Sequence, residues 1–174
     1  MFNKSQNKTN AVYFFDGKVN LPAQKSETTI EKNGKFYEQF ESMNGWISDV
    51  KVVDGYEAKT KDMIIFMSDD EDTYQIRFGV KSAYFRSFSR IFPNIELSKE
   101  VYIYPTQKTV EGEKKNGLVI KQSEVWLKRY YTLDNMENMP IAIPIEINGK
   151  TEYDYSDQNE FLISQIDASF AELK

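Results

Sequence analysis

The chain contains no cysteine and no histidine among its 174 residues. These absences exclude disulfides, zinc sites built from thiolate or imidazole ligands, and nucleophile–histidine catalytic systems. The eight glycines are scattered singly, so a glycine-rich phosphate-binding loop is also missing. Catalysis would have to rely on carboxylates and lysines alone. We therefore expect a protein that is not an enzyme and that uses no cofactor.

Long apolar segments are absent as well. No run of about 18 apolar residues occurs, and residues 1–10 contain no apolar core segment. We therefore expect neither a membrane span nor a secretory signal, and the expected location is the cytoplasm. The length is that of one domain, which can bury a core without disulfides or metal.

Negative charge is unevenly distributed. The net charge is -5, and from Glu152 onward six acidic residues stand against the single base Lys174, so the chain before this segment is neutral. An acidic carboxyl-terminal segment of this kind is either the solvated face of a terminal helix or an interaction site for other proteins.

The residues that are present favour strands. Aromatic residues make up 14% of the chain and occur with many Val and Ile residues. Alternating apolar and polar residues predict strands, Asn44 and Gly45 predict a bend, and a three- and four-residue period followed by Pro93 predicts a helix. The predicted strands are 11–15, 35–53, 63–67, 73–78, 101–105 and 118–133, the helix is 80–91, and 106–117 is a polar loop containing lysines.

The element order between residues 35 and 133 is informative. Five strands with a helix between the third and fourth is the order of an OB-fold Greek-key barrel. We therefore predict a mainly β protein with an OB-fold-like five-stranded barrel at 35–133 and an amino-terminal extension at 1–34 with a short strand. A generic five-stranded sheet with one helix is the alternative.

The carboxyl-terminal segment 134–174 is predicted to form a hairpin and an acidic helix packed on or beside the core. Strands at 141–147 and 151–155 flank the Asn148-Gly149 turn, and Ser156 is the expected N-cap of the helix. The apolar stripe of this helix is expected to comprise Leu162, Ile166, Phe170 and Leu173.

Binding features are better represented than catalytic ones. If Val101 and Ile103 point into the barrel, Tyr102 and Tyr104 point outward, and outward rings beside lysines form a surface on which nucleobases stack. Loops 54–61 and 106–117 would border the groove of such a barrel. The candidate nucleic-acid-binding residues are Trp46, Lys51, Tyr56, Lys59, Lys61, Arg77, Tyr102, Tyr104, Lys108, Lys114, Lys115, Lys121, Trp126, Lys128 and Tyr130.

Each of these residues also has an ordinary structural interpretation. Most aromatic residues of a small barrel fill its core, and lysine in a turn is common surface. The phenylalanines assigned to the core are Phe36, Phe40, Phe66, Phe78, Phe88 and Phe92. The acidic run 69–72 suggests a metal-dependent nuclease only as a minor alternative, because it lacks the spacing of a calcium loop and suits a charged hairpin turn.

The chain resembles phage-encoded single-stranded-DNA-binding proteins. The resemblance rests on the core from Gly45 to Leu133, the segment 84–88 leading to 92–95, and Tyr130, Tyr131 and Thr132 followed by Asn148, Gly149 and Lys150. It implies sequence-nonspecific coating of replication or recombination intermediates in the host-cell cytoplasm. It also implies recruitment of replication or recombination proteins through an acidic carboxyl terminus, although here that segment looks helical.

Two points stay open at the level of the sequence. The choice of DNA over RNA depends on the resemblance, because both polymers offer the same bases for stacking and the same charged backbone. The alternative function is a protein-interaction or structural module of a phage or replisome assembly.

Overall fold

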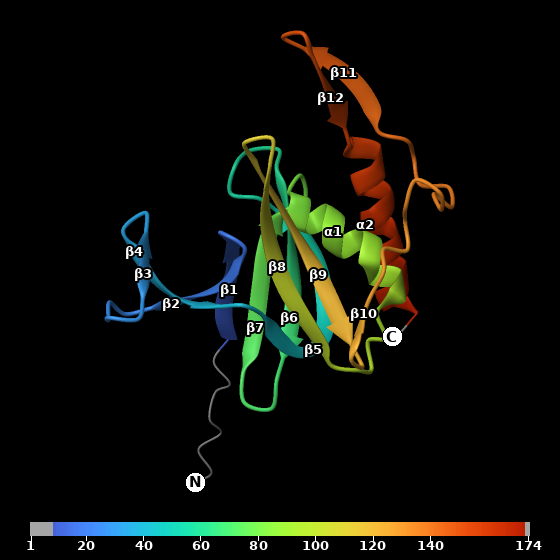
Figure 1. The fold of residues 1–174 in the computed structure, drawn as a ribbon. Coiled ribbons are helices and arrows are strands. Elements are labelled where there is room, and N and C mark those ends of the chain that lie inside the picture. Colours follow the sequence, from blue (N-terminus) through green and yellow to red (C-terminus); the bar gives the residue numbers. More distant parts are fainter. Residues whose placement is uncertain (1–8, 173–174) are drawn as a thin grey trace.

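The structure is a computed structural model that describes residues 9–172, and the prediction of a mainly β protein is confirmed. Within this range the chain forms a ten-stranded sheet, a separate two-stranded hairpin and two α-helices (Figure 1). The strands are β1 (Thr9–Phe15), β2 (Lys18–Ala23), β3 (Ile30–Lys32), β4 (Lys35–Phe40), β5 (Met43–Asp54), β6 (Lys61–Ser68), β7 (Thr73–Gly79), β8 (Val101–Val110), β9 (Glu113–Gln122), β10 (Val125–Trp126), β11 (Ile143–Ile147) and β12 (Lys150–Asp154). The helices are α1 (Ala83–Ile91), a 3-10 turn (Phe92–Asn94) and α2 (Ser156–Ala171).

The large sheet is open. Its strand order is β10-β9-β8-β5-β6-β7-β1-β2-β4-β3, and β1 pairs with β7 in parallel. The predicted barrel would close by joining its last strand, β9, to its third strand, β7. Instead β1 occupies the edge of β7, and α1 contacts both β7 and β9. The amino-terminal segment thus contributes strands to the same sheet as the core.

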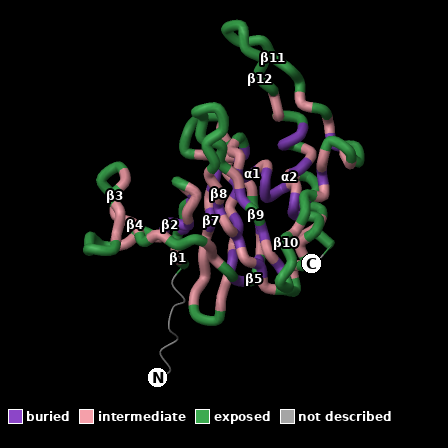
Figure 2. Tube along the Cα trace, viewed as in Figure 1, coloured by how far each residue is buried: buried purple, intermediate pink, exposed green. Residues whose placement is uncertain are grey.

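One face of the sheet and one side of each helix make the core. The strand alternation puts Val101, Ile103, Ile65 and Ile76 at 0% exposure. On α1, the 3.6-residue period brings Phe85 and other apolar residues onto this face. Figure 2 shows the buried residues concentrated along the central strands and in α1 and α2.

Helix α1 is close to its prediction. Ser82 is its N-cap, and its hydroxyl accepts a hydrogen bond from the backbone N–H of Phe85 at 3.1 Å. The predicted stop at Pro93 falls in the 3-10 turn that follows, because proline cannot continue the hydrogen bonding of an α-helix.

The predicted loop at 106–117 is wrong. Strands β8 and β9 continue through it as one long antiparallel hairpin, from Tyr102 opposite Lys121 to Val110 opposite Glu113. Glu111 and Gly112 form the two-residue turn with φ of +50° and +78°. Two-residue turns of this kind match the twist of the two strands that they join. The turn therefore lets polar residues on both sides of it pair as strands.

The long strands predicted at 35–53 and 118–133 are each interrupted. The first divides into β4 and β5, and a Cβ on Gly45 (φ +155°) would lie 2.5 Å from the backbone oxygen of Ser68, so the close pairing of β5 and β6 requires glycine. The second ends at Gln122, because Ser123 and Glu124 turn the chain with positive φ. The short strand β10 follows this turn, and no strand lies between Trp126 and β11.

The carboxyl-terminal prediction is confirmed in its elements. The hairpin β11–β12 projects from the body beside α2, which packs against α1 and β5 (Figure 1). Leu162 and Ile166 are buried, and Phe170 packs on the core, while Leu173 lies outside the described residues. Ser156 is not the N-cap; it is the first helical residue, and its backbone N–H donates to Oδ1 of Asp154 at 2.9 Å.

The phenylalanines predicted to fill the core do so in part. Phe78, Phe88 and Phe92 are buried. The prediction is wrong for Phe40, which is 44% exposed near the edge of the sheet, and for Phe36 and Phe66, which are half-buried and outside the core. No helix within residues 9–172 has the length and apolar character needed to cross a membrane.

Candidate functional site

A row of side chains crosses the outer face of β8, β9 and β10. Tyr102 lies opposite Lys121 in the β8–β9 register, and Lys121 lies opposite Trp126 in the β9–β10 register. Val101 and Ile103 are buried, so Tyr102 and Tyr104 point outward as predicted. The rings of Tyr104 and Trp126 meet edge to face at 5.1 Å. We call Tyr102, Tyr104, Lys121 and Trp126 the aromatic row.

Strand β5 extends the same face. Asn44 lies opposite Tyr102, and Trp46, two residues along β5, has 38% of its surface exposed. Lys51 lies further along β5, with its ammonium 5.2 Å from the centre of the Phe66 ring. Trp126 is the most exposed ring of the aromatic row, at 53%. Rings on adjacent strands are therefore partly open to solvent.

Acidic residues balance the cations of this face. The ammonium of Lys121 binds Glu124 at 2.6 Å, and Lys51 lies 3.4 Å from Asp49. The hydroxyl of Tyr102 lies 3.4 Å from Glu100, whose negative charge raises the pKa of that phenol. A phosphate near the aromatic row would compete with these carboxylates, so the face offers stacking more than positive charge.

The loop between β5 and β6 carries two of the predicted residues, Tyr56 and Lys59, and a third, Lys61, is the first residue of β6. Tyr56 is 90% exposed, and the guanidinium of Arg77 lies 4.2 Å from the centre of its ring. Arg77 also donates to Asp62 at 2.7 Å, a hydrogen bond that raises the pKa of Arg77. The guanidinium of Arg77 is thus already bound to the Tyr56 ring and to the Asp62 carboxylate.

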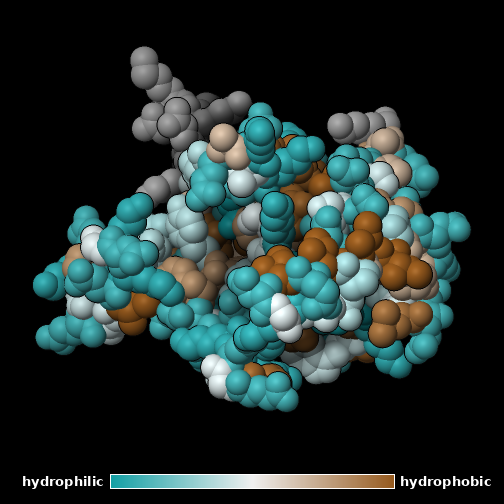
Figure 3. Space-filling view, turned by 90° about the horizontal axis from the view of Figure 1, so that it is seen from above, coloured by the Kyte–Doolittle hydropathy of each residue, from teal (hydrophilic) through white to brown (hydrophobic). Residues whose placement is uncertain are grey.

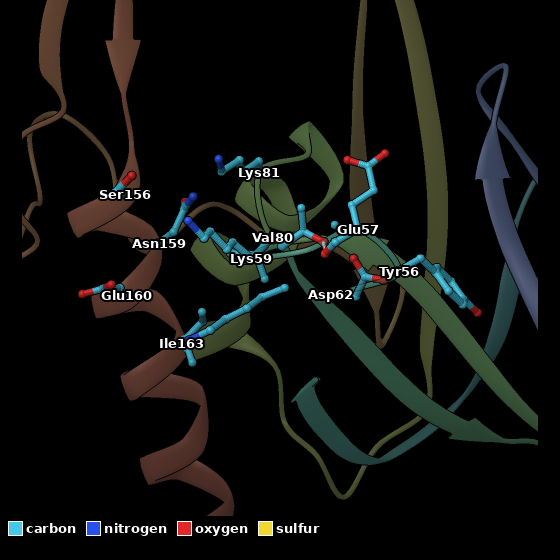
Figure 4. A pocket seen from close by; sticks show the side chains of 13 residues that line it. Tyr56, Glu57, Lys59, Asp62, Val80, Lys81, Ser156, Asn159, Glu160 and Ile163 are labelled. Atoms are coloured by element: carbon cyan, nitrogen blue, oxygen red, sulfur yellow. Dashed lines mark hydrogen bonds between the residues drawn. The ribbon is translucent and has the colours of Figure 1, made fainter. Parts of the chain in front are cut away.

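A pocket of about 460 Å³ lies between this loop and α2. Lys59 extends across it toward Asn159 of α2, and Lys81 borders it from the chain before α1, while Tyr56 lies on the side away from α2 (Figure 4). The side-chain oxygen of Asn159 is buried and accepts no hydrogen bond from the described residues. Glu57 and Glu160 also line this pocket, so its charge is mixed.

The lysines predicted in a loop lie on the β8–β9 hairpin. Lys108 is directly opposite Lys115, and Lys114 is opposite Thr109. Lys115 binds Glu113 at 2.8 Å, and this pairing raises the pKa of Lys115. Two like charges opposite each other oppose strand pairing, so this end of the hairpin is electrostatically unfavourable without a counter-charge.

A second pocket, of about 400 Å³, brings two of these lysines to three arginines that the predicted set did not contain. We call it the cationic pocket, and its basic residues are Arg86, Arg90, Lys114, Lys115 and Arg129. The remaining lining residues are Ala83, Ser87, Asn116 and Tyr155, so none of the described residues lines it with a carboxylate. One signal for this pocket was present in the sequence: Arg86 and Arg90 are four residues apart in the predicted helix, so they lie on the same face of it.

The last two predicted residues lie apart from both groups. Lys128 is exposed on the segment after β10, and its backbone oxygen accepts from Asn94 at 2.9 Å. Tyr130 donates its hydroxyl to Glu137 at 2.6 Å and packs edge to face on Tyr131. The hydrogen bond to Glu137 raises the pKa of Tyr130, and its ring is part of local packing.

The acidic run 69–72 forms the turn between β6 and β7. Oδ1 of Asp69 accepts the backbone N–H groups of Glu71 and Asp72 at 2.9 and 2.7 Å, and these bonds lower the pKa of Asp69. Among residues 9–172 no group of acids is arranged to hold a metal ion. Asp69 therefore stabilises a turn.

Comparisons with protein-family models, curated proteins and solved structures found no match.

Proposed function

We propose that this protein binds single-stranded nucleic acid, DNA before RNA, without sequence preference and without catalysis. The aromatic row carries the proposal. Its residues lie on three adjacent strands in register, with rings on β8 and β10, a lysine on β9 between them, and Trp126 half-exposed. A base stacked on such a ring contributes about 1–3 kcal/mol, whatever the base. Three rings on one face therefore suit successive bases of one strand.

The order of the core strands supports the OB-fold interpretation. A Greek key has the spatial order 4-1-2-3. Counting from β5, the observed order β8-β5-β6-β7 has this pattern, and β9 follows beside β8. We propose an opened OB-like arrangement in which α1 lies between β7 and β9. In OB folds the second and third strands, which correspond here to β6 and β7, border the ligand groove together with two loops. The aromatic row lies on β8, β9 and β10 instead, so its support is its own geometry and not the usual position of the groove.

The cations set the expected dependence on salt. Lys121, Lys51 and Arg77 must exchange their carboxylate partners for phosphates, whereas among the described residues of the cationic pocket only Lys115 is paired with an acid, Glu113. We therefore assign stacking to the aromatic row and most of the electrostatic attraction to the pocket. Coating of replication or recombination intermediates, and recruitment of proteins through acidic α2, belong to the same proposal.

Fluorescence of Trp46 and Trp126 tests this function directly. Titration with oligo-dT at low salt is expected to quench the emission, and the affinity is expected to fall as salt rises, with a slope of about 0.7 per phosphate contacted. Absence of quenching at low salt, or an affinity indifferent to salt, would contradict nucleic-acid binding.

The hairpin β11–β12 favours a second candidate, a protein-interaction module. Ile143, Ile145 and Ile147 share one face and remain 52%, 41% and 43% exposed. Figure 3, seen from above, shows hydrophobic surface on the side where the hairpin lies. A lone two-stranded hairpin is marginal in water, so a partner covering the isoleucines would stabilise it. Self-association that Ile145→Asp abolishes, without binding of oligo-dT, would favour this candidate.

A further inference from the structure

The cationic pocket concentrates positive charge in a small volume. Its five basic side chains come from α1, from the start of β9 and from the segment after β10, and they surround about 400 Å³. Within residues 9–172, Lys115 with Glu113 is the sole ion pair that involves any of these five. Arg86, Arg90, Lys114 and Arg129 thus face the pocket without a carboxylate.

Arg90 lies in an electrostatically unfavourable position in this pocket. Its Nη2 donates to Oε1 of Gln158 at 2.9 Å, but its Nε is buried without an acceptor among the described residues. Burial lowers the pKa of Arg90, and the positive charge of Arg129 lowers it further. A buried donor without an acceptor costs about 1–3 kcal/mol. An oxyanion that accepts a hydrogen bond from this N–H would remove that cost, which favours its binding.

The surrounding structure holds the cations in place. The backbone oxygen of Arg90 accepts the N–H of Tyr130 at 2.7 Å, which fixes the chain next to Arg129 against α1. Arg86 donates to the backbone oxygen of Lys81 at 2.8 Å, and its guanidinium lies 4.8 Å from the centre of the Tyr155 ring. Preformed donors lose little conformational entropy on binding a ligand.

We propose that the cationic pocket binds a phosphate monoester, either at the end of a nucleic-acid strand or on a free nucleotide. A groove that follows a nucleic-acid backbone spreads its cations along the strand. Here the five cations line one pocket of about 400 Å³. A monoester carries a charge of about -1.5 to -2 at pH 7 and three acceptor oxygens, which match guanidinium groups that line one pocket better than one diester does. The strand-end form of this proposal rests on the proposed function.

Paired ligands test the pocket in the full-length chain. Binding of oligo-dT strands of one length is measured with a 5′-phosphate, with a 3′-phosphate and with hydroxyls at both ends, together with thymidine monophosphate. One phosphorylated end is expected to raise the affinity about tenfold, as charge-assisted hydrogen bonds do. The preference is expected to weaken from pH 7.5 to 5.5, because the second pKa of a monoester is about 6.

Matched variants locate the preference. The double variant Arg129→Gln with Lys114→Gln changes exposed side chains and is expected to abolish the phosphate preference. The hydroxyl-ended strand is expected to bind this variant more weakly, because the pocket supplies electrostatic attraction, but still to stack on the aromatic row and quench tryptophan emission. The control Lys59→Gln with Lys61→Gln removes the same number of exposed charges at the other pocket and is expected to keep the preference. Circular dichroism establishes that each variant is folded.

The outcomes separate this inference from the proposed function. Equal affinity for phosphorylated and hydroxyl-ended strands, or a preference that survives Arg129→Gln with Lys114→Gln, overturns the phosphate assignment while strand binding stands. If no oligonucleotide binds but thymidine monophosphate does, with the same dependence on Arg129 and Lys114, the free-nucleotide form holds and the proposed strand binding is wrong.

Discussion

The aromatic row and the cationic pocket both include β9, yet they differ in how their charges are balanced. Lys121 in the aromatic row has Glu124 at 2.6 Å, and Tyr102 has Glu100 nearby. In the cationic pocket, Arg129 and Lys114 form no ion pair with a carboxylate of the described residues. The first region thus offers apolar rings with little net charge, and the second offers charge without exposed rings in a row. Each supplies what the other lacks for holding a polyanion of stacked bases.

Removing the rings is expected to have the largest effect on this comparison. The double variant Tyr102→Ala with Tyr104→Ala should weaken oligo-dT binding by about 2–6 kcal/mol, because each stacked ring contributes about 1–3 kcal/mol. Fluorescence titration measures the loss. The control Tyr153→Ala removes a ring that is 54% exposed on β12 and should leave the affinity unchanged. An equal loss of affinity for oligo-dT in both variants would contradict stacking of bases on the aromatic row.

The pairing that supports the aromatic row is expected to be sensitive at Gly45. Gly45→Ala should lower the free energy of unfolding by about 1–3 kcal/mol, since the added Cβ would lie 2.5 Å from the oxygen of Ser68. Urea denaturation measures it. Gly34→Ala is the control, because Gly34 has a positive φ of 75° but open space around it, and it should cost less. An equal cost would mean that the close contact at Gly45 relaxes.

Neutralising the acids should make the aromatic row more like the pocket. Glu100→Gln with Glu124→Gln keeps one acceptor oxygen at each position and removes two negative charges, each worth about 0.5 kcal/mol at a distance of about 8 Å in water. Affinity for oligo-dT should rise about fivefold at low salt and less at high salt. Glu31→Gln on β3, at the far edge of the sheet, is the control. An unchanged affinity would place the bound strand elsewhere.

A variant outside both regions gives a reference for stability alone. Asp69→Ala removes the acceptor of two turn hydrogen bonds and should lower the free energy of unfolding by about 1 kcal/mol at pH 7. Because the folded pKa of Asp69 is below 3.8, this contribution is present above pH 3.8 and is lost as the pH falls through the lower folded value. Acid denaturation measures it, and oligo-dT binding should not change.

Local pattern predicted several elements correctly for clear reasons. The alternation at Val101 to Tyr104 fixed both a strand and the outward direction of its tyrosines, and Asn148-Gly149 fixed a hairpin turn. The error at 106–117 arose because a polar hairpin extended from the body needs no apolar face. Strand β2 was missed, since its proline and polar residues resemble a loop until β1 and β4 pair with it.

The sequence by itself determined the strand-rich character, the two helices and the outward tyrosines of β8, because these follow from side-chain period within a few residues. Only the tertiary structure decided that the sheet stays open and that Arg129 and Lys114 meet Arg86 and Arg90. Those arrangements depend on contacts between residues far apart in the chain, where β1 competes for an edge and α1 lies beside β9. No local pattern encodes which edge is taken or which charges meet.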